Sequence, residues 1–255
     1  MPTTPTEIAV VIFCALFAGI SKSGFAGSVG ILATPLLAIT LNARFALGLL
    51  LPLLLAADIF NFYHFWKQWS RPALQMVVPG CIFGVLLGWP VLNFINRLEG
   101  SKDIMGAAIG IIAITFGSFR LYRELKDTTP TPFRPTKGHG IIAGTATGFI
   151  STLAHQGGVI PQMYLLPQKL DATTFVGTTT VIYFFTNLTK VPIFFAEGLL
   201  NPDTLRWAAY NIPLVFIGTA IGTYLNRRIS SKLFNRILIV FVLLTGLKLI
   251  ARAWN

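Results

Sequence analysis

Charged residues are scarce in this sequence. Only 11% of its 255 residues are charged and only nine are acidic, whereas a soluble domain carries about a quarter charged residues. More than half of the chain is hydrophobic, 54%, and the mean hydropathy is +0.69. This composition excludes a soluble domain of any size. It predicts an all-α polytopic membrane protein, since roughly 20 apolar residues make one membrane-spanning helix.

Cysteine and histidine are also rare. Cys14 and Cys81 both fall inside apolar segments, so we expect no disulfide, no metal site and no other cofactor. The formal net charge is +11, but the basic residues lie beside predicted helix ends. We therefore interpret them as signals of membrane topology and contacts with lipid headgroups, not as a nucleic-acid surface. The first residues lack a basic region, which predicts a retained first helix rather than a cleaved signal peptide.

Hydropathy predicts ten helical segments. We place them at about 7–21, 25–41, 44–66, 72–96, 103–122, 138–154, 158–170, 172–196, 203–226 and 231–253. A long polar loop divides the chain, so we expect a first transmembrane repeat at 1–123, a cytoplasmic linker at 124–137 and a second repeat at 138–255.

The two halves resemble each other at a nearly constant offset, which indicates an internal repeat. The matched positions are Gly19 with Gly148, Gly48 with Gly177, and Pro79, Gly84 and Gly88 with Pro213, Gly218 and Gly222. We expect two repeats of about five helical segments each, with short broken or re-entrant helices in each half.

The charges of the loops predict that the repeats are inverted. The turn with Lys67 and the central loop are basic, and so is the stretch that follows Arg227, whereas the turn with Glu197 and Asp203 is acidic. Basic loops favour the cytoplasm. Equivalent turns of the two halves would then lie on opposite faces of the membrane, with both termini outside.

Each half contains a polar, glycine-rich break in apolar sequence. Lys22 lies within residues 19–27, with no acidic residue nearby in the sequence, and residues 151–158 are the matching place. We expect the glycines to interrupt the helix at Lys22. Helices starting near Phe25 and Gly158 would direct their free N–H groups into the protein, and such helix starts attract anions.

These breaks and the polar residues of two later segments define a candidate site for an anion. Its predicted substrate-binding residues are Lys22, Ser23, Gly24, Gly27, His155, Gln156, Gly157, Gly158, Tyr183, Asn187 and Lys190. Asp58 and His155 are the candidates for binding a coupling proton. Three structural alternatives remain open: Asp58 as a partner of Lys22 or Lys190, His155 as an interhelical hydrogen bonder, and Lys190 reaching the headgroups.

The stretch from Gly19 to Leu37 resembles a signature of the TauE/SafE sulfite exporter family, as do the runs His155 to Pro161 and Asn187 to Lys190. The resemblance implies secondary transport of sulfite or organic sulfonates by alternating access in a bacterial inner membrane. Two other functions are a membrane enzyme with Asp58 and His155 as an acid–base pair, and an anion channel. The sequence has no nucleophile elbow, P-loop or metal-ligand spacing, which disfavours the enzyme. Broken helices at matched positions favour a carrier over a channel.

Overall fold

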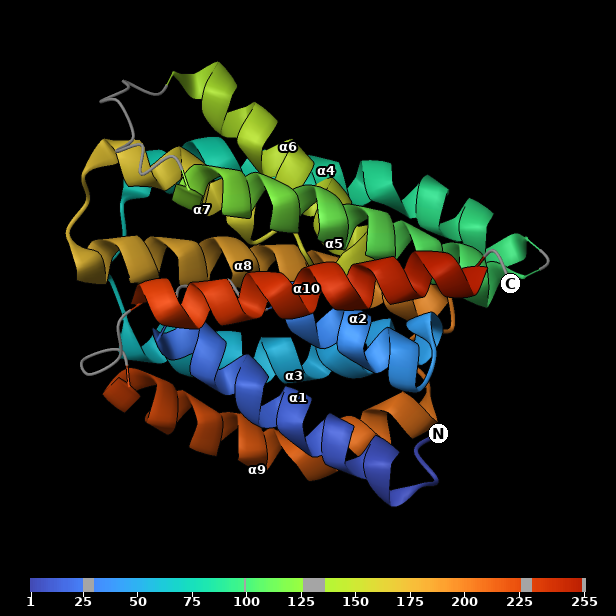
Figure 1. The fold of residues 1–255 in the computed structure, drawn as a ribbon. Helices are drawn as coiled ribbons and strands as arrows, with labels where there is room; N and C mark the ends of the chain where they lie inside the picture. Colours follow the sequence, from blue (N-terminus) through green and yellow to red (C-terminus); the bar gives the residue numbers. More distant parts are fainter. Residues whose placement is uncertain (25–29, 99, 126–135, 226–230, 254–255) are drawn as a thin grey trace.

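A computed structural model describes residues 1–24, 30–98, 100–125, 136–225 and 231–253 (Figure 1). These residues form ten α-helices and one short 3-10 helix, with no strand among them. The helices are α1 Pro5–Gly24, α2 Gly30–Thr40, α3 Ala43–His64, α4 Arg71–Arg97, α5 Ser101–Leu125, α6 Lys137–Ala154, α7 Val159–Leu165, α8 Ala172–Ala196, α9 Pro202–Leu225 and α10 Ser231–Ala253, with the 3-10 helix at Leu166–Gln168. The predicted all-helical class and its ten segments are confirmed.

Most helix ends agree closely with the sequence-based prediction, with corrections at Lys22 and in the seventh segment, predicted at about 158–170, where α7 ends at Leu165. Helices α8 and α10 begin and end at the predicted residues. The expected interruption at Lys22 is wrong, because α1 continues through Gly19 and Lys22 to Gly24. Gly19 faces α9, where an added methyl group would overlap the carbonyl oxygen of Val215. This glycine therefore allows two helices to pack closely and does not break its own helix.

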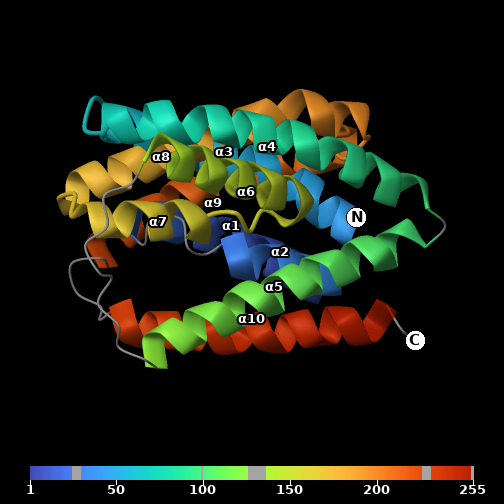
Figure 2. The ribbon, with the colours of Figure 1, turned by 90° about the horizontal axis from the view of Figure 1, so that it is seen from above.

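Two helices are too short to cross a membrane. Helix α2 has 11 residues and α7 has seven, or about 16 and 11 Å at 1.5 Å per residue, against a hydrocarbon core of about 30 Å. Helix α2 packs on α1, and α7 packs on α6. In both ribbon views each short helix returns towards the end of the molecule where its partner begins (Figures 1 and 2). The two hairpins enter from opposite ends.

Four helices in the described residues are long and apolar enough to span a bilayer. They are Pro5–Ser23, Ala43–His64, Arg71–Arg97 and Asp103–Tyr122. Helices α3 and α8 pack against each other, α4 packs against α8, and α9 packs against α3. The spanning window of α3 is 72% buried, more than that of the other three. Polar residues on α3 and α8 are therefore held away from lipid.

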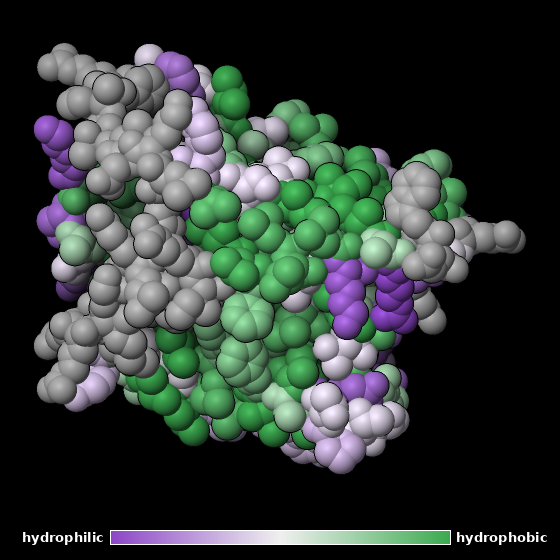
Figure 3. Space-filling model, viewed as in Figure 1, coloured by the Kyte–Doolittle hydropathy of each residue, from purple (hydrophilic) through white to green (hydrophobic). Residues whose placement is uncertain are grey.

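The polar ends of the molecule are separated by a hydrophobic band (Figure 3). One end, here called the basic end, carries the 65–70 and 166–171 turns and the start of α6, with Lys67, Arg71, Lys137 and Lys169. Both termini and the 197–201 turn lie at the opposite end, here called the terminal end (Figure 1). The band and the paired polar ends are what a membrane-embedded chain requires.

Candidate functional site

Asp58 lies at the centre of the described site. It is on α3 and is fully buried. The ammonium group of Lys22, on α1, forms an ion pair with Oδ1 of Asp58, and the side-chain amide of Asn187, on α8, donates to Oδ2 at 2.6 Å. The structural alternative in which Asp58 is a partner of Lys22 is therefore confirmed. The two residues lie 36 positions apart in the sequence, so no acidic neighbour of Lys22 in the sequence indicated the pair.

Lys190 forms a second buried cluster without an acid. Its Nζ atom lies 2.9 Å from Oγ of Ser151, 3.3 Å from the Ser151 carbonyl oxygen and 2.8 Å from Nδ1 of His155. Lys190 is fully buried, so it does not reach the lipid headgroups. Its three N–H bonds are matched by three neutral acceptors, which satisfies its hydrogen bonding while leaving its charge uncompensated.

His155 connects this cluster to α3. It is the C-cap residue of α6 with a left-handed backbone, φ 53°, a conformation that costs a non-glycine residue roughly 1–2 kcal/mol. Its Nε2 atom lies 3.0 Å from the carbonyl oxygen of Leu47. Since that oxygen only accepts, Nε2 carries the ring proton and Nδ1 accepts from Lys190. The imidazole is thereby assigned as neutral.

The charges of the two clusters do not cancel. Two ammonium groups, on Lys22 and Lys190, face one carboxylate, on Asp58, and a neutral His155. Among the described buried residues the only other acid is Glu197, which caps the far end of α8. With both lysines protonated, the site would carry one positive charge in excess, and burying such a charge is costly unless an anion joins it.

A small cavity lies between the two clusters. Its volume is about 30 Å³, where about 10–15 Å³ holds one water molecule. It is lined by Ala18, Ser21, Lys22, Ala33, Leu50, Leu54, Thr147, Ser151, His155, Gly157, Gly158, Tyr183, Thr186 and Asn187. The lining is mostly polar along α6 and α8. In this conformation the site is nearly closed, and its cavity has room only for water-sized molecules.

Several predicted site residues line this cavity or hold its wall. Tyr183 donates from its hydroxyl to the carbonyl oxygen of Gly158 at 2.6 Å, and the Lys22 ammonium lies 4.8 Å from the centre of its ring. Gly157 packs closely on the carbonyl oxygen of Thr147. The structure thus brings Lys22, Tyr183, Asn187 and the 155–158 segment together.

Other predicted residues take different roles. Ser23 donates to the carbonyl oxygens of Thr219, at 2.8 Å, and Gly19, at 3.1 Å; it joins α1 to α9 and is not among the residues that line the cavity. Gln156 is fully buried without lining the cavity, and its amide atoms have no hydrogen-bond partner. Gly24 ends α1. Gly27 and Phe25 lie outside the described residues.

The set of site residues predicted from the sequence does not include three polar residues of the site, Ser151, Thr147 and Thr186. Ser151 binds Lys190, and all three line the cavity. The predicted repeat offered a signal for Ser151, because Ser151 lies 129 positions after Lys22, the same separation as Asp58 and Asn187. Thr147 and Thr186 also donate to their own helices, the ordinary behaviour of threonine, and carried no separate signal.

A family comparison identifies what kind of protein contains this site. The profile of the family described as "Sulfite exporter TauE/SafE" matches residues 11–249. The chain belongs to the TauE/SafE family. It is therefore a multi-pass membrane transporter and not an enzyme, in agreement with the resemblance seen in its motifs. Neither the curated proteins nor the solved structures gave a significant match. The TauE/SafE match covers α1 to α10, so it includes both lysine clusters.

Proposed function

We propose that this TauE/SafE protein carries sulfite or an organic sulfonate across the membrane by alternating access, with the anion bound between Lys22 and Lys190. The presence of two buried lysines but only one buried aspartate beside the central cavity is the observation that carries the proposal. One negative charge on the substrate would balance the excess of two protonated lysines over one carboxylate. Cations and amides that are already positioned in a water-poor site bind such an oxyanion without reorganisation.

The cavity indicates which step of transport this conformation represents. At about 30 Å³ it is too small for an aryl group, and even sulfite requires its walls to separate. We interpret it as a closed state between inward and outward openings. An organic substrate would contact Leu50 and Leu54, which line the same space.

Matched helix contacts support an inverted repeat as the basis of the motion. Gly148 of α6 packs against the carbonyl oxygen of Cys81 in α4, as Gly19 of α1 packs against that of Val215 in α9. Gly48 and Gly177 likewise meet the carbonyl oxygens of Leu199 and Gln68. Glycines at equivalent positions of the two halves thus make equivalent contacts. Such contacts are expected if inverted repeats at 1–123 and 138–255 are joined by a linker at 124–137.

Asp58 is the better candidate for a coupling proton. Protonating His155 would place a second positive charge on Nδ1, 2.8 Å from the Lys190 ammonium, and like charges at that distance repel strongly. Protonating Asp58 would instead free Lys22 from its ion pair and add positive charge to the site. A proton on Asp58 and an anion in the cavity would then favour each other, and both would cross together.

The basic end is proposed to face the cytoplasm of a bacterium, with the protein in the inner membrane. The positive-inside rule supports this orientation, since Lys67, Arg71, Lys137 and Lys169 gather there. Both termini would then be outside.

Counterflow in proteoliposomes tests the proposed function. Vesicles loaded with unlabelled sulfite or toluenesulfonate should accumulate the labelled anion transiently, whereas a channel would pass current without such exchange. Sulfate and acetate are the competing anions. The double variant Lys22→Met with Asp58→Asn, which removes the ion pair without leaving a lone charge, should abolish exchange. Exchange at the parental rate in that variant would remove Lys22 from the site.

A further inference from the structure

A second cavity lies beside α7, between this short helix and α5. Its volume is about 170 Å³, several times that of the central cavity. The residues that line it are Phe119, Arg120, Val159, Gln162, Met163 and Leu166. At about 10–15 Å³ for each water molecule, it has room for roughly a dozen. The second cavity can therefore admit a small anion, whereas the central cavity in this conformation cannot.

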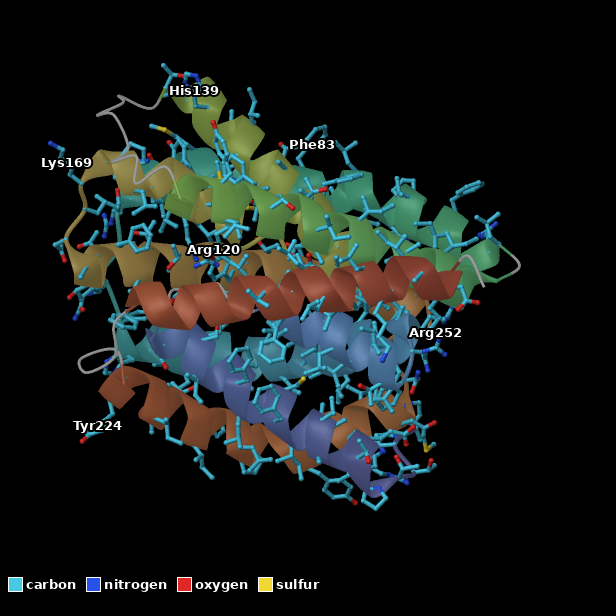
Figure 4. All side chains as sticks on the ribbon, viewed as in Figure 1. Phe83, Arg120, His139, Lys169, Tyr224 and Arg252 are labelled. Atoms are coloured by element: carbon cyan, nitrogen blue, oxygen red, sulfur yellow. The ribbon has the colours of Figure 1, made fainter. Side chains whose placement is uncertain are left out.

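The second cavity leads from the surface of the basic end into the fold. Two of its lining residues, Leu166 and Phe119, are 50% and 38% exposed, whereas a third, Val159, is only 6% exposed. Figure 4 shows Arg120, another lining residue, within the outline of the helices, and Lys169 at the edge of the basic end. The exposure of the lining therefore falls from the basic end towards the centre of the molecule.

The two cavities share a wall that includes a tyrosine. Gly158 lines the central cavity, and the next residue, Val159, lines the second one. Tyr183 of α8 also lines the central cavity. Its hydroxyl donates to the carbonyl oxygen of Gly158 at 2.6 Å, and its side chain is hydrogen-bonded to Gln162 of the second cavity. One peptide unit and one tyrosine therefore separate the two spaces, and the two hydrogen bonds of the tyrosine hold this wall closed.

The same tyrosine contacts the charged cluster of the central site. The Lys22 ammonium lies 4.8 Å from the centre of the Tyr183 ring, a distance at which a cation is attracted to the face of an aromatic ring. Lys22 is also the partner of Asp58 in the buried ion pair. An anion or a proton that changes the position or the pairing of Lys22 would therefore act directly on the residue that closes the wall.

A second tyrosine nearby is equally buried but lines neither cavity. Tyr164 of α7 is 6% exposed, against 7% for Tyr183. Its hydroxyl donates to Sδ of Met76, on α4, at 3.4 Å, and it is absent from the lining of both cavities. Tyr164 therefore provides a matched comparison for the loss of one buried hydroxyl.

We propose that the cavity beside α7 is the vestibule through which the transported anion passes between the central cavity and the basic end, and that Tyr183 is the gate between them. Breaking its bonds to Gly158 and Gln162 would let the first turn of α7 move away from α8 and join the two spaces. The passage of an anion rests on the proposed function. The gate itself rests on the two cavities and on the contacts of Tyr183.

Cysteine labelling tests the gate without relying on transport. Leu54→Cys introduces a thiol in the central cavity, and Met163→Cys introduces one in the second cavity. The membrane-impermeant sulfonatoethyl methanethiosulfonate is added to sealed membrane vesicles that contain the full-length protein. Lys169→Cys, at the exposed edge of the basic end, identifies the vesicles in which that end faces the reagent. Cys14 and Cys81 are fully buried, so the parent protein gives the background rate.

From the basic end, the thiol at position 163 should react readily and the thiol at position 54 slowly. Tyr183→Phe removes the hydroxyl and keeps the ring. It should speed labelling at position 54 by about five- to tenfold, the change expected from losing one buried hydrogen bond. Gln162→Met should act in the same direction, and the double variant should show less than the product of the two effects, because the two side chains share one bond. Tyr164→Phe should leave the rate unchanged.

Three outcomes would overturn the gate. One is a thiol at position 163 that does not react from the basic end, since the second cavity would then not be a vestibule. Another is labelling at position 54 that Tyr183→Phe leaves at its original rate. The third is an equal acceleration when the terminal end faces the reagent, which would indicate a loosened fold and not an opened wall. None of these measurements depends on counterflow, so failure of the proposed transport activity and failure of the gate give different results.

Discussion

The two buried lysines of this transporter have partners of opposite kinds, one charged and one neutral. Lys22 of the first half is paired with a carboxylate, Asp58, whereas Lys190 of the second half is surrounded by neutral acceptors on Ser151 and His155. The offset of the proposed repeat relates these contacts, since Ser151 stands 129 positions after Lys22 and Asn187 stands 129 positions after Asp58. The two clusters therefore differ in charge, and in the proposed function this difference supplies the charge for an anion.

The largest expected effect comes from breaking the charged pair. Lys22→Met leaves Asp58 as an uncompensated carboxylate in a fully buried position, which typically destabilises a protein by about 3–5 kcal/mol. Thermal unfolding in detergent measures this loss, with a thiol-reactive dye reporting exposure of Cys14 and Cys81. Adding Asp58→Asn should recover most of the stability without recovering anion binding. A single variant as stable as the parent would mean that the pair carries little energy.

Replacing the other lysine, Lys190, should weaken anion binding much more than it lowers stability. Lys190→Met leaves Ser151 and His155 without a donor but creates no lone charge, so we expect a loss of about 1–3 kcal/mol in stability. Anion affinity should fall on the order of 100-fold, as measured by calorimetry with toluenesulfonate. Lys248→Met, an exposed lysine on α10, is the control. If Lys190→Met destabilised the protein more than Lys22→Met does, the two clusters would not differ as described.

The same comparison predicts which residue couples transport to protons. Asp58→Asn should preserve exchange of labelled anion while removing its acceleration by a pH gradient across the liposome membrane. His155→Gln should slow both processes and keep the gradient dependence, because Nδ1 already accepts from Lys190. The measurement is anion uptake with and without an imposed gradient. Gradient-independent uptake in His155→Gln, together with gradient-driven uptake in Asp58→Asn, would reverse the assignment.

The helices were predictable from this sequence, whereas the contacts between them were predictable only where matched positions in the two halves gave a signal. Apolar length and charged ends defined α8 and α10 to the residue. The pairing of Lys22 with Asp58 depends on how α1 lies against α3, which hydropathy does not determine. Gly19 shows the same limit, since a glycine that allows close packing and a glycine that breaks a helix look alike in one sequence.

The end of α5 shows a related limit. Hydropathy predicts a segment that ends at about residue 122, whereas α5 continues to Leu125. Hydropathy falls at the first charged residue of a helix end, although the helix itself can extend further. Charged residues in the last turns of a membrane helix are therefore the ones whose surroundings most need a structure.

The smallest effect on stability is expected from a substitution outside the site, in a turn where the two halves of the chain carry opposite charges. The equivalent turns after α3 and α8 carry Lys67 and Glu197, and Glu197 accepts from Trp89, Asn93 and Asn96. Burial raises the pKa of Glu197, but these donors outweigh it and hold the pKa below its ordinary value of 4.5. The folded state therefore favours the carboxylate. Its contribution to stability is complete above pH 4.5 and is lost as the pH falls through the lowered pKa.

Glu197→Gln should consequently flatten the loss of thermal stability on acidification below pH 4.5, while slightly lowering stability at neutral pH. Unfolding temperatures from pH 7 down to pH 3 measure both changes. Asp103→Asn, an exposed acid at the same end, controls for the loss of one negative charge. If Glu197→Gln kept the full acid sensitivity of the parent, the donors from α4 would not be stabilising the charged form. The terminal end would then depend on the packing of Trp89 rather than on its hydrogen bond.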